Sequence, residues 1–187
     1  MQQTSKFLIT SLPRSRTAWW SVLTSTPASL CLHEPLRRCQ SFDDLDALWS
    51  APEPQYLGVS DSGLATQIGR IMAEIQPRTL IIDRDIGEAL DSFLKYFSDF
   101  PVDKVKAAAY FRISAQALSH YCDHPMTKIV RFADLHDFDA VNECYEWLMP
   151  DNPWPLRPDI FNMNIQADAG ALAFEVATQP HTMWHAA

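Results

Sequence analysis

Four short apolar segments, separated by longer stretches with helical periodicity, constrain this chain more than any other feature of its sequence. The segments read FLITS, YLGVS, TLIID and KIVRF, at residues 7–11, 56–60, 79–83 and 128–132. Each is rich in Ile, Leu or Val and is bounded by turn-forming or polar residues, as strands buried on both faces are. The alternation predicts an α/β protein with three layers, in which helices flank a mainly parallel central sheet.

The connections between these segments carry the helical pattern. Apolar residues recur at helical spacing over residues 64–75 and 86–97, and residues 104–121 are rich in Ala and contain neither Gly nor Pro. Residues 139–149 form another helical segment, which Pro150 ends. We therefore expect a helix in each of these ranges, in addition to one that follows the first strand.

The length of 187 residues fits a single domain (residues 1–187) with a full hydrophobic core. We expect that core within residues 5–150. Four prolines between positions 150 and 158 predict an extended segment that closes the domain. Residues 151–187 then form a C-terminal extension, which either packs on the core or reaches a partner.

Charge and composition narrow the possible partners. The formal net charge of −8 argues against nucleic acid, although a local basic cluster can still bind a small anion. The sequence has neither a signal-like apolar segment near its start nor a run of transmembrane length, so we expect a cytoplasmic protein without a membrane partner. The four cysteines lack C-x-x-C and zinc-finger spacing, which predicts free thiols and no metal site.

The turn after the first strand carries the clearest functional signal. It contains Arg14, Ser15, Arg16 and Thr17, just where a helix is expected to begin. Ligands of open α/β sheets bind beyond the carboxyl ends of the strands, and free N–H groups at a helix start attract anions. Salt bridges to an acidic surface are the alternative use of the two arginines. The turn lacks the glycines and lysine of a Walker A loop, which disfavours hydrolysis of ATP or GTP.

The segment LPRSRTAW at residues 12–19 resembles the 5′-phosphosulfate loop of sulfotransferases that use 3′-phosphoadenosine 5′-phosphosulfate (PAPS). That loop usually reads P-[KR]-S-G-[TS]-T-W, so Arg16 stands here where the family has glycine. By this resemblance Arg14 stabilises the bridging oxygen, and Trp19 stacks on the adenine, whereas Trp20 belongs to the core. The donor-binding residues implied in this segment are Arg14, Ser15, Arg16, Thr17, Ala18 and Trp19.

A second stretch resembles the family's 3′-phosphate motif, in which Arg-Asp-Pro ends a strand and a serine follows eight residues after the arginine. Here Arg84 and Ser92 keep that spacing, and Ile86 replaces the proline. The resemblance implies that Arg84 and Ser92 bind the 3′-phosphate of the donor. A helix cap with a surface ion pair is the alternative interpretation.

A third stretch, KIVRFADL at residues 128–135, resembles the family's late strand and its R-[YF]-E-D-L turn, with Ala133 in place of an acid. The three stretches occur in the family's order and span most of residues 7–148. Together they imply the three-layer fold that P-loop nucleotide kinases and sulfotransferases share.

The general base is expected soon after the first helix, where His33 and Glu34 are neighbours. A glutamate at this place serves some bacterial and carbohydrate-acting relatives, so Glu34 is the first candidate and His33 the second. A capped turn with an ordinary ion pair is the alternative. Asp61 and Ser62 follow another strand and could face the acceptor. The family's C-terminal Arg-Lys-Gly segment is missing, and Arg157 could replace it.

The sequence thus predicts an enzyme, a PAPS-dependent sulfotransferase that acts on a hydroxyl or amine of a small-molecule or glycan acceptor. Two alternatives remain open: a P-loop kinase of a small molecule, and a sulfotransferase-like protein that binds nucleotide without turnover. Neither the acceptor nor the oligomeric state is indicated by the sequence.

Overall fold

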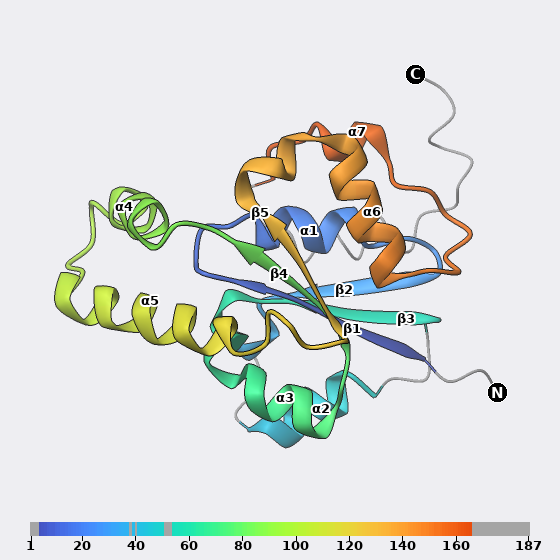
Figure 1. Cartoon of the computed structure of the whole chain (residues 1–187), viewed down its shortest axis with the longest axis horizontal. Helices are drawn as coiled ribbons and strands as arrows, with labels where there is room; N and C mark the ends of the chain where they lie inside the picture. Colours follow the sequence, from blue (N-terminus) through green and yellow to red (C-terminus); the bar gives the residue numbers. More distant parts are fainter. Residues whose placement is uncertain (1–3, 38, 40, 51–53, 166–187) are drawn as a thin grey trace.

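The computed structural model describes residues 4–37, 39, 41–50 and 54–165. These residues form a five-stranded, all-parallel sheet with the strand order β2-β3-β1-β4-β5 (Figure 1). The strands are β1 (Ser5–Ser11), β2 (Ser29–His33), β3 (Tyr56–Ser60), β4 (Arg78–Asp83) and β5 (Thr127–Arg131). The predicted α/β fold with a parallel central sheet is confirmed.

Helices cover both faces of the sheet. The α-helices are α1 (Thr17–Leu23), α2 (Phe42–Leu48), α3 (Ile68–Glu74), α4 (Ile86–Tyr96), α5 (Lys104–Ser119), α6 (Phe138–Leu148) and α7 (Pro158–Phe161). Three 3₁₀ helices are η1 (Pro35–Arg37), η2 (Ser62–Gln67) and η3 (Phe132–His136). Figure 1 shows α1, α6 and α7 on one face and α2 and α3 on the other, while α4 and α5 form an arm that extends past the sheet.

The side chains of β1 alternate between two hydrophobic clusters, as a strand between two helical layers requires. Phe7 and Ile9 pack in the cluster that contains residues of α1 and α6, whereas Leu8 packs with residues of α2 and α3. All three are fully buried. The three-layer architecture therefore follows from the continuous apolar run that the first strand shows in the sequence.

Strand β2 and helix α2 were not predicted, and the short helix α7 lies where the sequence indicated only an extended segment. Strand β2 lies at the edge of the sheet, and its apolar run in the sequence, at residues 30–32, is only three residues long. Helix α2 begins at a capping box, in which Ser41 accepts from the Asp44 N–H and Asp44 accepts from the Ser41 N–H. The pattern S-x-x-D before an apolar stretch is the signal that could have predicted α2.

The first part of the C-terminal extension packs on the core. Leu156 and Ile160 are buried in the cluster that contains α1 and α6. The indole N–H of Trp19 donates to the carbonyl oxygen of Phe161 at 3.2 Å. Residues 151–165 thus close one side of the domain, and the rest of the extension, residues 166–187, lies outside the described residues.

All four cysteines lie in the described part of the chain and are free thiols, as predicted. Burial raises the pKa of Cys31 to about 12 and that of Cys144 to about 11, so neither is a reactive thiolate at neutral pH. In the same part of the chain, no helix combines the length and the apolar character that a membrane crossing needs.

The order of the strands determines where a ligand can bind. Strand β1 lies between β3 and β4. The chain leaves β1 toward β2 on one side of the sheet and leaves β4 toward β5 on the other. Where the connections of two adjacent strands diverge in this way, an open α/β sheet has its binding crevice. The turn at residues 12–16 and the turn after Asp83 therefore flank the expected ligand position.

Candidate functional site

The turn between β1 and α1 is built on two arginines in the left-handed backbone region. Arg14 has φ 68° and Arg16 has φ 64°. This conformation is free for glycine but costs about 1–2 kcal/mol for a residue with a Cβ atom. Helix α1 is only seven residues long, and Arg16 at its start provides no side-chain cap. Tertiary contacts must therefore hold the turn in place.

Contacts from three other elements hold this turn. The guanidinium of Arg84, at the end of β4, donates to the carbonyl oxygen of Arg14. Arg16 Nη1 donates to the carbonyl oxygen of Leu135 in η3 at 3.3 Å. The buried hydroxyl of Ser60 donates to the carbonyl oxygen of Thr17 at 2.8 Å. The structure thus brings together the first turn, the Arg84 turn and η3, the three stretches that the sequence singled out.

The guanidinium groups of the site lie against aromatic rings. The Cζ atom of Arg14 is 4.0 Å from the ring centroid of Tyr96, and that of Arg84 is 4.0 Å from the ring centroid of Phe132. None of the ion pairs formed by the described residues includes Arg14, Arg16 or Arg84. A ring contacts the flat face of a guanidinium and leaves the N–H groups at its rim available for an anion.

Several polar atoms of the site are buried without a hydrogen-bond partner. They are Nε of Arg14, Nε of Arg84 and Oγ of Ser15, and Ser15 is fully buried. A buried polar group without a partner costs about 1–3 kcal/mol. Burial also lowers the pKa of Arg16 and of Arg84, where Glu88 opposes the shift and Arg14 adds to it. An anion bound at this turn would supply the missing acceptor atoms and the missing charge.

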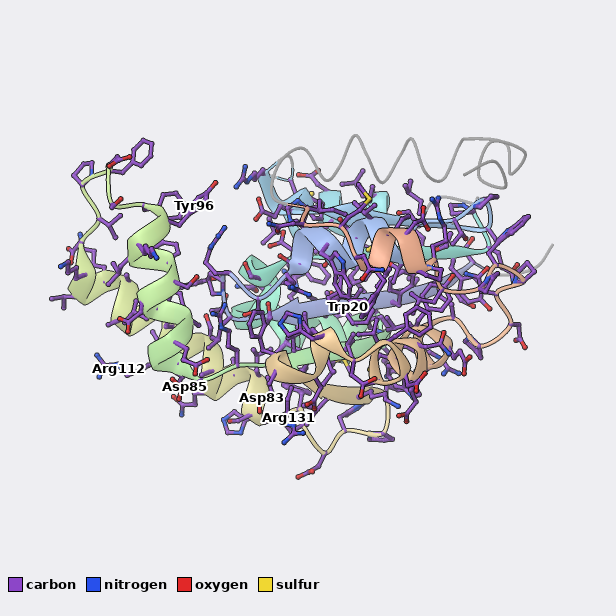
Figure 2. The ribbon with its side chains drawn as sticks, turned by 90° about the horizontal axis from the view of Figure 1, so that it is seen from above. Trp20, Asp83, Asp85, Tyr96, Arg112 and Arg131 are labelled. Atoms are coloured by element: carbon purple, nitrogen blue, oxygen red, sulfur yellow. The ribbon has the colours of Figure 1, made fainter. Side chains whose placement is uncertain are left out.

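The stretch from Arg84 to Ser92 contains both the cap of α4 and residues on the side of α4 that faces the first turn. Asp85 caps α4, because its carboxylate accepts from the Glu88 N–H at 2.9 Å, so the helix-cap interpretation is confirmed for this residue. Ser92 is partly buried and lies one helical turn before Tyr96, so the two share one side of α4. In Figure 2, Tyr96 and Asp85 lie at opposite ends of α4. Because the Tyr96 ring contacts Arg14, this side of α4 faces the first turn.

Trp19 lies in the core and not at the surface beside the turn. Its exposed fraction is 2%, and its ring packs against the edges of Trp20 and Phe161. Trp20 is fully buried within the body of the domain (Figure 2). Ala18 packs against the same cluster. The structure therefore does not present the Trp19 ring to a ligand in the way that stacking on adenine requires.

Tyr96 and Phe132 are the site residues that the sequence did not identify. Phe132 comes directly after β5, at the same sheet edge as Arg84, and this position was the available signal. Tyr96 ends α4 and reaches the site only because the arm folds beside the first turn. No local pattern in the sequence predicts that contact.

The end of β2 carries the two candidates for the general base. The Glu34 carboxylate is 2.6 Å from Arg37 Nη2 and 3.8 Å from His33 Nε2. The predicted alternative, a turn with an ion pair, thus describes Glu34 as the structure shows it. Burial is the main cause that lowers the pKa of His33, with Glu34 opposing the shift and Arg37 adding to it. His33 is therefore neutral at pH 7 and able to accept a proton.

Asp61, directly after β3, is a buried carboxylate with an exposed fraction of 3%. Its Oδ1 accepts from the Gly63 N–H at 2.7 Å, and its Oδ2 accepts from the Leu36 N–H at 3.4 Å. Burial outweighs these two hydrogen bonds and raises the pKa of Asp61 to about 6, and Glu34 contributes to the rise. Asp61 thus joins the end of β3 to the turn that follows Glu34.

Arg157 is engaged near the start of α7. Its Nε donates to Asp159 Oδ1 at 3.1 Å, and its Nη2 also contacts this carboxylate. The Asp159 carboxylate therefore balances the charge of Arg157. Within the described ranges, no group of three or more His, Cys, Asp or Glu side chains is arranged to hold a metal ion.

Comparisons with known proteins support the architecture. No protein-family model matches the chain, and no curated protein matches it. Among solved structures, a sulfotransferase from Alicyclobacillus acidocaldarius matches with a TM-score of 0.59 and 11% sequence identity. The match covers 98% of this chain and 99% of that chain. At this level of identity, the likeness shows that the two chains share a fold over their whole length.

Proposed function

We propose that this chain is a sulfotransferase that moves a sulfuryl group from PAPS to a hydroxyl or amine of a small-molecule or glycan acceptor. One observation carries the proposal: Arg14, Arg16 and Arg84 surround one turn at the binding crevice and form no ion pair within the described residues. The fold shared with a solved sulfotransferase and the order of the three sequence stretches support it.

The residues of the site fit a donor with two separate anionic groups. Ser15 Oγ and Arg14 Nε are buried without acceptors, and the 5′-phosphosulfate would supply them. Thr17 would add a hydroxyl. The 3′-phosphate would lie against Arg84, whose Nε also lacks an acceptor, with Ser92 on the adjoining helix. In a chain of net charge −8, three arginines that form no ion pair within the described residues are a local exception that suits a multiply charged anion.

The chemistry would depend on position and charge. The acceptor oxygen or nitrogen bonds to sulfur as the bond from sulfur to the bridging phosphate oxygen breaks, and negative charge builds on that oxygen. Arg14 would stabilise this charge, and the Tyr96 ring holds its guanidinium in place. Since arginine stays protonated, Arg14 acts here as a fixed charge. The proton of the acceptor would pass to His33 or Glu34 at the end of β2.

Calorimetric titration with 3′-phosphoadenosine 5′-phosphate, the desulfated donor, tests the proposal, with ADP and ATP as comparison ligands. We expect binding that requires the 3′-phosphate and that weakens about tenfold to a hundredfold in Arg84→Ala, because a charge-assisted hydrogen bond is lost. Arg112→Ala is the matched control, since this exposed arginine of α5 donates to the Ala108 carbonyl oxygen of its own helix and lies on the outer side of the arm (Figure 2). A preference for ATP, or no nucleotide binding, would contradict the proposal.

A further inference from the structure

Arg16 is an unusual residue for its backbone conformation. It precedes α1 with φ 64° and ψ 25°, a conformation that glycine adopts without strain. The arginine side chain adds backbone strain and does not cap the helix. Neither the turn nor α1 therefore gains local stability from arginine at this position, and the guanidinium is the part of the residue that can explain its presence.

The guanidinium of Arg16 extends toward the same short helix as that of Arg84. Arg16 Nη1 donates to the Leu135 carbonyl oxygen in η3, and Arg84 lies on the ring of Phe132, the first residue of η3. Arg14 extends in a different direction, toward Tyr96 at the end of α4. Arg84 lies between the other two arginines: its guanidinium donates to the Arg14 carbonyl oxygen, and it shares η3 with Arg16.

The acid of η3 is already engaged. Asp134 binds Arg131 through two hydrogen bonds, of 2.7 and 3.0 Å. Arg16 forms no ion pair among the described residues, and its guanidinium donates to a neutral carbonyl oxygen, that of Leu135. A guanidinium has five N–H donors, so most of those of Arg16 remain for a ligand. Burial lowers the pKa of Arg16, which an anion beside it would reverse.

We propose that Arg16 and Arg84 bind one and the same phosphate, the 3′-phosphate of the donor. This inference rests on the proposed function and adds to it a specificity-determining residue that the phosphosulfate-loop pattern, with its glycine, does not supply. Arg16 would then be the second cation at the 3′-phosphate. Arg157, which the sequence suggested for that role, is bound to Asp159. Arg16 then determines how strongly the protein prefers a nucleotide with a 3′-phosphate over one without it.

The test compares the affinities of two ligands in the full-length wild type and in Arg16→Gly. The ligands are 3′-phosphoadenosine 5′-phosphate and adenosine 5′-phosphate, which differ only in the 3′-phosphate. Glycine suits the left-handed backbone, so Arg16→Gly removes the side chain without adding strain, and thermal unfolding checks that the fold is retained. We expect the affinity for the bisphosphate to fall at least about tenfold, and that for adenosine 5′-phosphate to change less than about twofold.

Arg16→Lys and a double variant sharpen the test. Lysine keeps the charge but loses the forked donor geometry, so we expect a loss between those of wild type and Arg16→Gly. If both arginines bind one phosphate, the losses in Arg16→Gly and Arg84→Ala are not additive in the double variant.

Three results would overturn the inference. Equal losses for both ligands would place Arg16 at the 5′ end, unchanged affinities would leave it without a role in binding, and additive losses would separate it from Arg84. A fourth outcome is that the wild-type protein binds the bisphosphate no better than adenosine 5′-phosphate. That outcome contradicts the proposed function itself, so the two failures are distinguishable.

Discussion

The carboxyl edge of the sheet has a basic half and an acidic half. They differ in how fully the protein itself provides partners for their charged and polar groups. In the basic half, beyond β1, β4 and β5, Arg14, Arg16 and Arg84 lie on aromatic rings or reach carbonyl oxygens, and buried polar atoms lack partners. In the acidic half, beyond β2 and β3, Glu34 is paired with Arg37, and Asp61 accepts two backbone hydrogen bonds.

The difference separates the evidence for binding from the evidence for catalysis. Charges and polar atoms that the protein leaves unsatisfied are expensive, and they persist where a ligand completes them. The basic half has this character and therefore supports a donor site directly. The acidic half holds its turns together with its own contacts, so a role for His33 or Glu34 in proton transfer has to be shown by kinetics.

The largest effect on donor binding is expected when a carboxylate is introduced into the basic half by Arg84→Glu. Arg84→Glu would pair with Arg14 or Arg16 and would repel a phosphate. We expect binding of the desulfated donor to weaken by more than about a hundredfold, which calorimetry can measure. Thermal unfolding of the same variant tests whether the fold survives. Donor binding within tenfold of wild type would mean that the three arginines are not the anion site.

Burial of Asp61 in the acidic half can be tested through the pH dependence of the free energy of unfolding. Its pKa is raised to about 6, above its ordinary value, so the folded protein keeps a proton that the unfolded chain releases near pH 4. Native Asp61 thus lowers the free energy of unfolding as the pH rises from about 4 to 6, on the order of 2–3 kcal/mol. Asp61→Asn lacks this decline, although it loses the Leu36 hydrogen bond.

Urea unfolding at pH 4.5 and 7.5 measures this effect, with Asp91→Asn on the exposed surface of α4 as the control. We expect the stability of Asp61→Asn relative to wild type to improve between the two pH values. The relative stability of Asp91→Asn should stay nearly constant. A constant difference between Asp61→Asn and wild type would show that burial does not perturb this carboxyl.

A smaller effect is expected at Tyr96, which tests whether aromatic rings position the arginines. Tyr96→Leu removes the ring face beneath Arg14, and a partly exposed cation–π contact is worth about 0.5–1 kcal/mol. We expect donor affinity to fall about two- to fivefold, while Tyr96→Phe, which keeps the face, stays at the wild-type value. Equal losses in both variants would assign the effect to the hydroxyl group.

The smallest effect on binding is expected at Glu34. Glu34→Gln breaks the ion pair with Arg37 in the acidic half and leaves the basic half intact, so donor affinity should change less than about twofold. Transfer of labelled sulfate to an acceptor found by screening phenols and sugars should fall at least about a hundredfold if Glu34 is the base. Unchanged transfer in this variant would leave His33 as the candidate.

The sequence predicted the elements whose signals are local. Strands β1, β3, β4 and β5 are continuous apolar runs, and the first turn and the Arg84 turn follow from their places after two of these strands. The edge strand β2 was not predicted, because its apolar run is only three residues long and lies in the segment that follows the first helix. The contacts of Arg14 with Tyr96 and of Arg84 with Phe132 depend on how the arm and η3 fold back, which no local pattern encodes.

Trp19 and Trp20, adjacent in α1, also show that local sequence patterns do not predict contacts with distant segments. The resemblance to the phosphosulfate loop implied Trp19 at the adenine and Trp20 in the core. Helix α7 packs on α1 and covers Trp19 as well, with the Phe161 carbonyl oxygen accepting its indole N–H. The position of the C-terminal segment relative to α1 depends on tertiary packing. The prolines in the sequence predict only an extended chain there.

A crystal structure of the protein with 3′-phosphoadenosine 5′-phosphate tests the central claim most directly. We expect the 5′-phosphate within hydrogen-bonding distance of Ser15 Oγ and the backbone of residues 14–17, and the 3′-phosphate against Arg84. Nucleotide bound elsewhere, with Arg14 and Arg84 still on their aromatic rings and without an anion, would contradict it.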